Sequence, residues 1–265
     1  MRPTVTRRGR LAVALWQIWL PLALLLLWFV ASAGSSSPFW PPLSDIFAAM
    51  LDWALGGGMA ADLAFSFGNY LVALALALLV GIGAGIVIGL TPRAARVLDP
   101  YLDLLRSLPI VVFVPIVVLV LGIGAFPKIF LIAVACVWPI LLHTIEGVRS
   151  IAPSVFEAGR AYRIPLGLSV RKIVLPGALP QIVVGVRLAI TVGLVMLVVS
   201  EMYGSTHGVG YFILNSSQRF KLADAWAGTL LVGVIGWAIT QAYAALEHRL
   251  LAWYRQDDGA PASRR

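Results

Sequence analysis

The chain has little charge for its length. Asp, Glu, Lys and Arg make up 12% of its 265 residues, whereas soluble globular proteins carry about 25%. Apolar and aromatic residues make up 60%. A chain with so few charged side chains lacks the surface of a soluble domain, and the composition therefore predicts an integral membrane protein.

Cysteine is also scarce. Cys136 is the single cysteine and lies within an apolar run, which excludes an intrachain disulfide and a cysteine-based metal site. We expect its side chain to pack as a small buried hydrophobe. The three histidines lie in separate segments without ligand spacing. The sequence therefore indicates no metal site and no set of catalytic residues.

The sequence contains no GxxxxGK[ST] motif, so no ATP site of the P-loop kind is expected. Gly81, Gly85 and Gly89 recur every four residues. They lie within an apolar stretch, where small residues at this spacing are typical of close helix packing. We interpret these glycines as a packing face rather than as a phosphate-binding loop.

Six apolar stretches dominate the chain. A helix needs about 20 residues to cross the hydrocarbon core, and it satisfies its backbone polar groups internally. We therefore predict an all-α polytopic membrane protein with about six transmembrane helices. The first stretch ends in Ala31-Ser32-Ala33, as a signal peptide would, but its length favours a retained helix. The stretches cover residues 11–33, 69–90, 109–125, 127–143, 182–202 and 225–245.

Lys and Arg are distributed unevenly between the connecting segments. Connecting segments rich in Lys and Arg alternate along the chain with segments that are poor in them. The poor segments contain three of these residues, Lys128, Arg219 and Lys221. Because Lys and Arg concentrate in cytoplasmic segments, both termini and the loop 144–181 are predicted to be cytoplasmic. The net charge of +8 then reflects contact with an anionic leaflet rather than with nucleic acid. The basic segments contain sixteen Lys and Arg residues and cover residues 1–10, 91–108, 144–181 and 246–265.

The predicted organisation has five parts. A cytoplasmic tail (1–10) precedes the first transmembrane helix (11–33), which an external connection (34–68) follows. A core transmembrane domain (69–245) contains the loop 144–181, and a cytoplasmic tail (246–265) ends the chain.

Segment 154–176, SVFEAGRAYRIPLGLSVRKIVLP, is a charged stretch between two apolar ones. Ser154 and Glu157 form a capping-box pattern, which predicts a helix with Glu157 in its first turn. Pro165 is expected to interrupt this helix, and Pro176 to end a second short one. The segment could be a solvated basic loop, or a helical hairpin that inserts into the groove of a partner.

This segment resembles the EAA loop of ABC importer permeases, the cytoplasmic segment that docks on the ATPase subunit. The resemblance implies that the loop couples the two subunits. The matching residues are Glu157, Ala158, Gly159, Ile173, Leu175 and Pro176.

The chain departs from the family pattern at one position of the loop. The family usually has glycine six residues after the glutamate, where this chain has Arg163. We expect Pro165 and Gly167 to supply the turn instead, because proline and glycine are the usual turn residues.

The resemblance covers about residues 43–254. Segments 98–124, 127–151 and 198–214 look like the nitrate, sulfonate and taurine branch of ABC importer permeases. This implies a type I importer permease fold with cytoplasmic coupling helices in the bacterial inner membrane. The chain is then a transport subunit and not an enzyme, and it binds no cofactor. The implied partners are membrane lipid, a second permease copy, an external solute-binding protein and a cytoplasmic P-loop ATPase that holds ATP and Mg²⁺.

Three residues are candidates for the translocation path or a gate. Glu201 lies at the outer end of the fifth stretch, where a membrane-edge carboxylate is a functional candidate. It could face the path, pair with Arg219 or Lys221, or be an ordinary interfacial side chain. Trp138 and Pro139 lie within the fourth stretch and could line a pore or simply pack.

The resemblance implies a small solute, such as the anions sulfonate, taurine or nitrate, and a small heterocyclic nutrient or vitamin precursor is the alternative. A secondary transporter driven by an ion gradient is disfavoured, because such proteins use charges deep within their spans. An enzyme acting on lipids would need clustered acidic residues or histidines. Asp99 and Asp103 are the nearest such pair, and we interpret them as ion-pairing residues on a helix surface.

Overall fold

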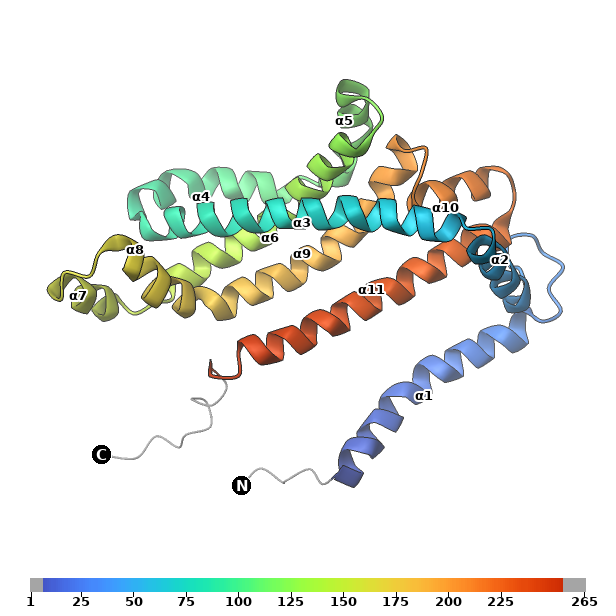
Figure 1. Ribbon diagram of the computed structural model, residues 1–265, viewed down its shortest axis with the longest axis horizontal. Coiled ribbons are helices and arrows are strands. Elements are labelled where there is room, and N and C mark those ends of the chain that lie inside the picture. The colour runs from blue at the N-terminus through green and yellow to red at the C-terminus, as the bar shows by residue number, and fades with distance from the viewer. Residues whose placement is uncertain (1–6, 255–265) are drawn as a thin grey trace. The chain divides into compact units, whose positions relative to one another are not determined.

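The computed structural model describes residues 7–254, and this part of the chain is helical without any strand (Figure 1). The predicted all-α class is therefore confirmed. The elements are α1 (Arg7–Ser32), α2 (Leu43–Leu55), α3 (Gly58–Leu90), α4 (Pro92–Ser107), η1 (Ile110–Phe113), α5 (Val114–Leu121), α6 (Ala125–Arg149), α7 (Pro153–Ala161), α8 (Leu166–Ser169), η2 (Val170–Val174), α9 (Leu175–Gly204), α10 (Val209–Gln218) and α11 (Leu222–Leu250).

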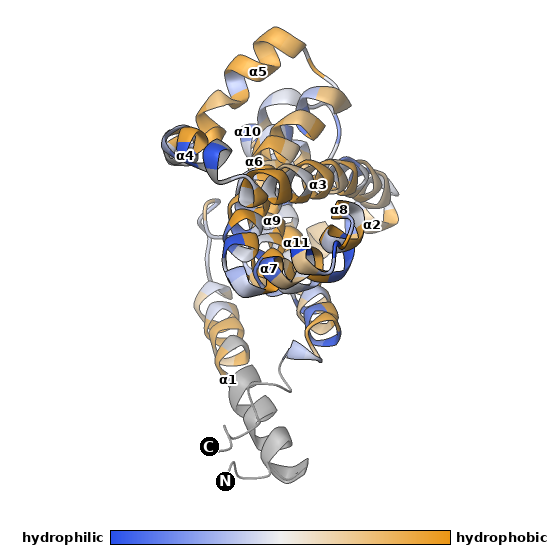
Figure 2. Cartoon of the chain, turned by 90° about the vertical axis from the view of Figure 1, so that its left-hand side faces the viewer, coloured by the Kyte–Doolittle hydropathy of each residue, from blue (hydrophilic) through white to orange (hydrophobic). Residues whose placement is uncertain are grey.

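Four of the described helices are long and apolar enough to cross a membrane. Figure 2 shows hydrophobic residues along α3 and α5, whereas hydrophilic residues gather in α4. The predicted stretch 11–33 lies in α1, which contributes the shorter apolar helix Leu22–Ser32. The four long helices are Gly58–Leu90, Ala125–Arg149, Leu222–Leu250 and the continuous run Leu166–Gly204.

The predicted third span, 109–125, is wrong as a single transmembrane helix. The structure forms the short 3₁₀ helix η1 and the eight-residue helix α5 in its place. Pro109 precedes η1, and Pro115 occupies the first turn of α5, where its missing N–H is tolerated. Gly122, with φ +80°, and Gly124, with φ +157°, then end the helical path.

The body formed by residues 60–212 and 231–254 is built around α3, α6 and α9. Helices α6 and α9 pack along much of their length. The glycine face predicted in the second stretch lies against α6, which confirms its packing role. A Cβ atom added at Gly85 would lie 2.5 Å from Cβ of Thr144, and one at Gly89 would lie 2.7 Å from Cβ of Val148. Only glycine permits this approach of the two helices.

Cys136 is fully buried in the core of this body, as its apolar sequence context predicted. Its thiol donates a hydrogen bond to the carbonyl of Ala189 at 3.3 Å. Tyr70 of α3 donates to the carbonyl of Ile190 at 3.0 Å. These two contacts fasten α6 and α3 to the same turn of α9.

A second, smaller body comprises residues 7–59 and 213–230. Its core contains Leu43 and Ile46 of α2 and Ala227 of α11. Trp28 and Trp226 pack against this core, and their rings and that of Trp40 have centroids 5.4 to 6.1 Å apart. Such large aromatic side chains supply much of the buried area in a small core.

Candidate functional site

The segment that resembles a coupling loop folds as a helical hairpin, α7 followed by α8. Pro153 occupies the first turn of α7, and Ala152 is its N-cap. The predicted capping box is wrong, because no side chain caps this helix and Glu157 lies beyond its first turn. Proline is well suited to a first helical position, since its φ is preset and it has no N–H to satisfy. The helix therefore begins before Ser154.

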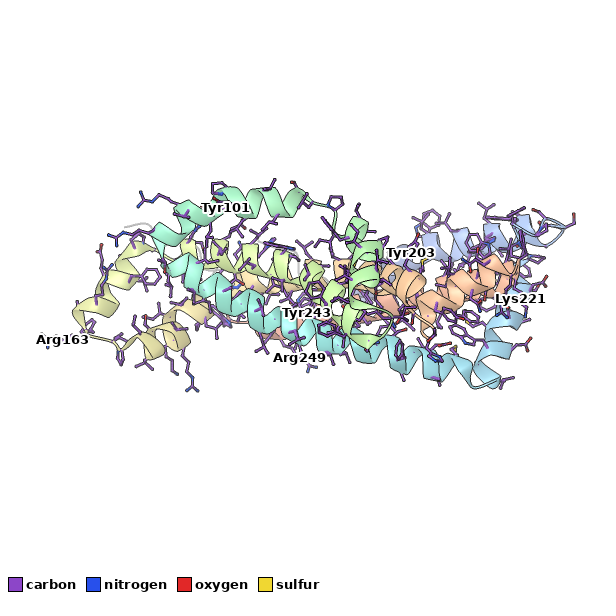
Figure 3. The ribbon with its side chains drawn as sticks, turned by 90° about the horizontal axis from the view of Figure 1, so that it is seen from above. Tyr101, Arg163, Tyr203, Lys221, Tyr243 and Arg249 are labelled. Atoms are coloured by element: carbon purple, nitrogen blue, oxygen red, sulfur yellow. The ribbon has the colours of Figure 1, made fainter. Side chains whose placement is uncertain are left out.

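The turn of the hairpin lies at Arg163, which adopts φ +52°. Its N–H donates to the carbonyl of Arg160 at 3.0 Å, and the N–H of Ile164 donates to the carbonyl of Gly159 at 2.9 Å. Figure 3 shows Arg163 at the far tip of the loop. The prediction that Pro165 and Gly167 supply the turn is wrong. Arginine takes the left-handed conformation at the position where the family usually has glycine.

Replacing this arginine by glycine is expected to stabilise the turn. A non-glycine residue in the left-handed region costs about 1–2 kcal/mol, and part of this is offset by the greater unfolded-state entropy of glycine. We therefore expect Arg163→Gly to slow hydrogen exchange of the 160–164 amides about threefold, with uptake unchanged. Hydrogen exchange measured by mass spectrometry tests this. The control is Arg171→Gly, because Arg171 has a φ below zero and gains nothing from glycine. The amides around residue 171 should exchange faster in this control. Faster exchange of the 160–164 amides in Arg163→Gly would contradict the view that the left-handed backbone of Arg163 is strained.

The predicted stop at Pro176 is also wrong. Helix α8, the π-helical turn η2 and α9 form one continuous helical run, Leu166–Gly204. Pro176 lies in the first turn of α9, and Pro180 lies inside it. The π-helical turn directly precedes Leu175 and Pro176. Pro176 has no N–H and interrupts the backbone hydrogen bonds of the helix, and the i→i+5 bonds of a π-helical turn accommodate this interruption.

The two halves of the coupling motif meet in the hairpin. A Cβ atom at Gly159 would lie 3.6 Å from Cδ1 of Ile173, an ordinary contact. Phe156 and the buried Val174 belong to one apolar cluster with Val148 of α6. Glu157 and Ala158 are exposed. The hairpin is thus attached to α6 and α9 by its apolar side, while its Glu-Ala side is free to meet a partner.

A second candidate region surrounds Glu201, which is fully buried at the end of α9. Its Oε2 accepts hydrogen bonds from Oγ of Ser66 and from the N–H of Gly210, both at 2.9 Å. The N–H of Val209 donates to Oγ of Ser66 at 3.0 Å. Oε1 of Glu201 has no hydrogen-bond partner among the described residues. The pairing with Arg219 or Lys221 that we considered is replaced by this network.

Two further side chains hold the same loop. The N–H of Gly208 donates to Oδ1 of Asp62 at 2.8 Å. Lys128, only 2% exposed, donates to Oγ of Ser205 at 2.8 Å and lies 4.4 Å from the ring centroid of Phe65. Together with Glu201 and Ser66, these groups fasten the segment 205–210 to α3, α6 and α9.

Glycine is required in this loop. Gly208 has φ +105°, and a Cβ atom there would lie 2.5 Å from the carboxyl carbon of Glu201. A Cβ atom at Gly210 would overlap the carbonyl oxygen of Val198. Asp62, Ser66 and Lys128 were not among the predicted site residues, although the closely spaced glycines after Glu201 marked this loop in the sequence.

Trp138 and Pro139 lie apart from Glu201 and share a different environment. Both line a cavity of about 250 Å³, together with Val195 and Met196 of α9 and Ile110 of η1. Every residue that lines this cavity is apolar. The three residues predicted for the path or gate therefore do not form one site. Trp138 and Pro139 line a cavity, and Glu201 is a buried carboxylate elsewhere.

Arg187 of α9 forms an ion pair through its guanidinium with Glu247 of α11. The hydroxyl of Tyr243 donates to the carbonyl of Val183 at 2.8 Å nearby. These contacts tie α11 to α9. Asp99 pairs with Arg149 of α6 at 3.0 Å, in keeping with its predicted ion-pairing role. The side chain of Asp103 lies outside the described residues.

The chain matches one family of known proteins. A family model described as a binding-protein-dependent transport system inner membrane component matches residues 77–252. The chain is 30% identical over 241 residues to the taurine transport system permease protein TauC of Escherichia coli K12, covering 89% of this chain and 88% of that protein. It is 33% identical over 189 residues to SsuC of Bacillus subtilis 168, named as an aliphatic sulfonates transport permease, covering 70% and 68%. It is 32% identical over 177 residues to the bicarbonate transport system permease protein CmpB of Synechococcus elongatus, covering 66% and 64%.

Solved structures show the same fold. The MetNI methionine ABC transporter in an inward-facing conformation matches 75% of this chain and 96% of its own, with a TM-score of 0.60 and 18% identity. An amino acid ABC transporter matches 79% and 98%, with a TM-score of 0.56 and 15% identity. The chain belongs to the binding-protein-dependent transport system inner membrane components, the permease subunits of ABC importers.

Proposed function

We propose that this permease, paired with a second permease copy, forms the path by which a small solute with an anionic group, such as a sulfonate, taurine or nitrate, enters the cell. An external solute-binding protein delivers the solute, and a cytoplasmic ATPase supplies the energy. ATP and Mg²⁺ bind to that ATPase, since the present sequence has no P-loop motif. The observation that carries the proposal is the hairpin α7–α8, with its exposed Glu157 and Ala158.

The way in which the hairpin is attached supports the proposed coupling role. Phe156 of α7 and Val174 of η2 lie in one cluster with Val148 of α6 and Ala178 of α9. A force applied by the ATPase to the exposed side of the hairpin therefore acts directly on two long helices. The bound nucleotide then shifts the permease between its states through differential affinity for them. In this role Arg163 sets the hairpin turn, while Pro165, Gly167, Ile173, Leu175 and Pro176 shape its second half.

We assign the apolar cavity beside Trp138 and Pro139 to the translocation path. Its wall includes Val192 and Val195 of α9 and carries no charged side chain. Such a wall gives an anion little specific recognition, because selective sites use precisely placed polar groups. We therefore assign substrate selection to the binding protein. The permease itself gates the passage.

Glu201 has a gate-supporting role in this proposal. Its carboxylate links Ser66 of α3 to Gly210, at the end of the segment 205–210, and is itself removed from solvent. A carboxylate in this position would repel an anion if it faced the path. Its burial within protein removes this difficulty.

The relatives favour a substrate with an anionic group, since they are named for aliphatic sulfonates, taurine and bicarbonate. A heterocyclic nutrient carried by the same class of importer is the second candidate. The buried charges Lys128, Glu201 and Glu247 lie in the end turns of their helices. This placement disfavours a secondary transporter, in which ionisable groups form relays deep within the membrane.

Reconstitution of the complete importer into proteoliposomes tests the proposal. With the binding protein outside and ATP inside, we expect uptake of radiolabelled taurine or ethanesulfonate that persists after all ion gradients are collapsed. Unlabelled sulfonates should compete, and a neutral pyrimidine should not. Uptake driven by an ion gradient without ATP would overturn the ATP-driven mechanism, and competition by the pyrimidine alone would select the heterocyclic substrate.

A further inference from the structure

A cavity of about 550 Å³ lies between the hairpin α7–α8 and the ends of α3 and α6. Its volume is within the range of sites that enclose small organic ligands, about 300–1,000 Å³. The cavity is thus large enough to hold a substantial apolar group. The wall is mainly apolar and includes Leu90, Val148, Ile151, Phe156, Ile164 and Val174.

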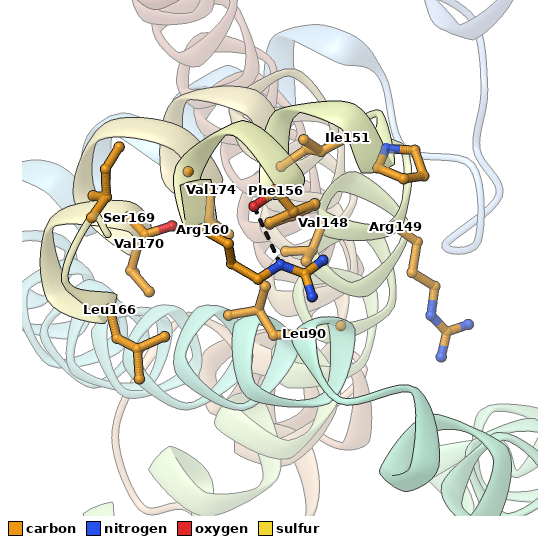
Figure 4. A pocket seen from close by; sticks show the side chains of 14 residues that line it. Leu90, Val148, Arg149, Ile151, Phe156, Arg160, Leu166, Ser169, Val170 and Val174 are labelled. Carbon is orange, nitrogen blue, oxygen red and sulfur yellow. Dashed lines mark hydrogen bonds between the residues drawn. The ribbon is translucent and has the colours of Figure 1, made fainter. Parts of the chain in front are cut away.

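One cationic side chain reaches into the middle of this apolar wall. Figure 4 shows Arg160 extending across the cavity beside Leu90 and Val148. Its Nε donates to the carbonyl of Phe156 at 3.4 Å. The terminal nitrogens of its guanidinium have no hydrogen-bond partner among the described residues. The site therefore offers charged hydrogen-bond donors directly beside an apolar surface.

The other charged residue of the lining is already engaged. Arg149 points to the side of the cavity in Figure 4, and its guanidinium pairs with Asp99 at 3.0 Å. The hydroxyl of Ser169 also lines the cavity. No acidic residue is among the lining residues. The cavity therefore favours a ligand that combines a negative charge with an apolar body.

The cavity lies where two membrane helices end. Leu90 is the last residue of α3, and Arg149 is the last residue of α6. The surrounding loop, 144–181, is the most basic internal segment and is predicted to face the cytoplasm. The cytoplasmic leaflet carries anionic lipids, and basic pockets between membrane helices on that side bind their head groups.

We propose that this cavity binds an anionic phospholipid, with its phosphate at Arg160 and part of an acyl chain along the apolar wall. The lipid contacts α7 and α8 on one side and α3 and α6 on the other, so its binding restrains the hairpin. Regulation of coupling by this lipid rests on the proposed function of the hairpin. Lipid binding itself does not, and it is measured without the ATPase.

Native mass spectrometry of the purified full-length chain tests this inference. Phosphatidylglycerol is titrated into the detergent-solubilised protein, with phosphatidylcholine as the zwitterionic comparison. We expect one phosphatidylglycerol to bind more tightly than the rest, and Arg160→Gln to weaken this binding about fivefold. The matched control is Arg171→Gln, which removes the same charge from an exposed residue that does not line the cavity. This control should bind as the wild type does.

A second variant tests the cavity without changing its charge. Ser169→Phe places a large ring at the lining and is expected to exclude the lipid about as strongly as Arg160→Gln does. Equal weakening by Arg160→Gln and Arg171→Gln would overturn the proposal in favour of diffuse attraction to the basic loop. Unchanged binding in Ser169→Phe would place the lipid elsewhere. Displacement of the lipid by glycerol 3-phosphate alone would show a phosphate site without an acyl chain and would also overturn it.

Discussion

Glu157→Lys combined with Ala158→Asp is expected to reduce ATP-driven uptake at least about a hundredfold. Both side chains are exposed on α7, so the double variant leaves the apolar attachment of the hairpin in place. It inserts wrongly placed charges into the surface proposed to enter the ATPase, and like-charge or unpaired contacts there cost several kcal/mol. A loss of 2.8 kcal/mol already corresponds to a hundredfold weaker complex. Initial uptake rates in proteoliposomes with equal protein content measure the effect.

Glu146→Lys is the matched control for this variant. It repeats the Glu-to-Lys exchange of the double variant at an exposed residue in the last turn of α6, outside the hairpin. We expect it to transport at nearly the wild-type rate. Normal uptake by the double variant would show that the hairpin does not couple the permease to ATP hydrolysis.

Glu201→Ala is expected to lower the unfolding temperature by about 5 °C or more and to reduce uptake at least about tenfold. The substitution leaves the N–H of Gly210 and the hydroxyl of Ser66 without their acceptor in a buried site. Each buried group that loses its partner costs about 1–3 kcal/mol, and 1 kcal/mol shifts the unfolding temperature of a protein of about this size by roughly 2–4 °C. Thermal unfolding in detergent and uptake measure the two effects.

Two controls separate the lost hydrogen bonds from the lost charge. Glu201→Gln keeps an acceptor oxygen for Ser66 and Gly210, so it should retain most of the stability. Glu146→Ala removes an exposed carboxylate and should leave both measurements unchanged. An unaltered unfolding temperature in Glu201→Ala would contradict the view that this network fastens the segment 205–210.

Composition and local spacing were sufficient to predict the class of fold and the contact face of α3. Gly81, Gly85 and Gly89 are four residues apart, so they share one side of any helix that contains them. The structure places each against a branched side chain of α6. Hydropathy overestimated the helix at 109–125, because an average over a window does not register prolines and glycines that end a helix. The chain there turns at Gly122 and Gly124 instead.

The candidate site was predicted in part, and the failures have physical reasons. The motif around Glu157 is local, and its two halves lie close together, since a Cβ atom added at Gly159 would be 3.6 Å from Cδ1 of Ile173. The left-handed Arg163 was not foreseen, because the neighbouring Pro165 and Gly167 have the stronger turn propensity. The partners of Glu201 lie up to 135 residues away in the sequence, and no local pattern identifies such a pairing.

Co-purification of this permease with its co-expressed P-loop ATPase tests the central claim most directly. The wild-type chain should retain the ATPase through detergent extraction and affinity purification, and the Glu157→Lys, Ala158→Asp variant should lose it. If the wild type retains no ATPase, or if the double variant retains it fully, the hairpin α7–α8 is not the element that joins this permease to its energy source.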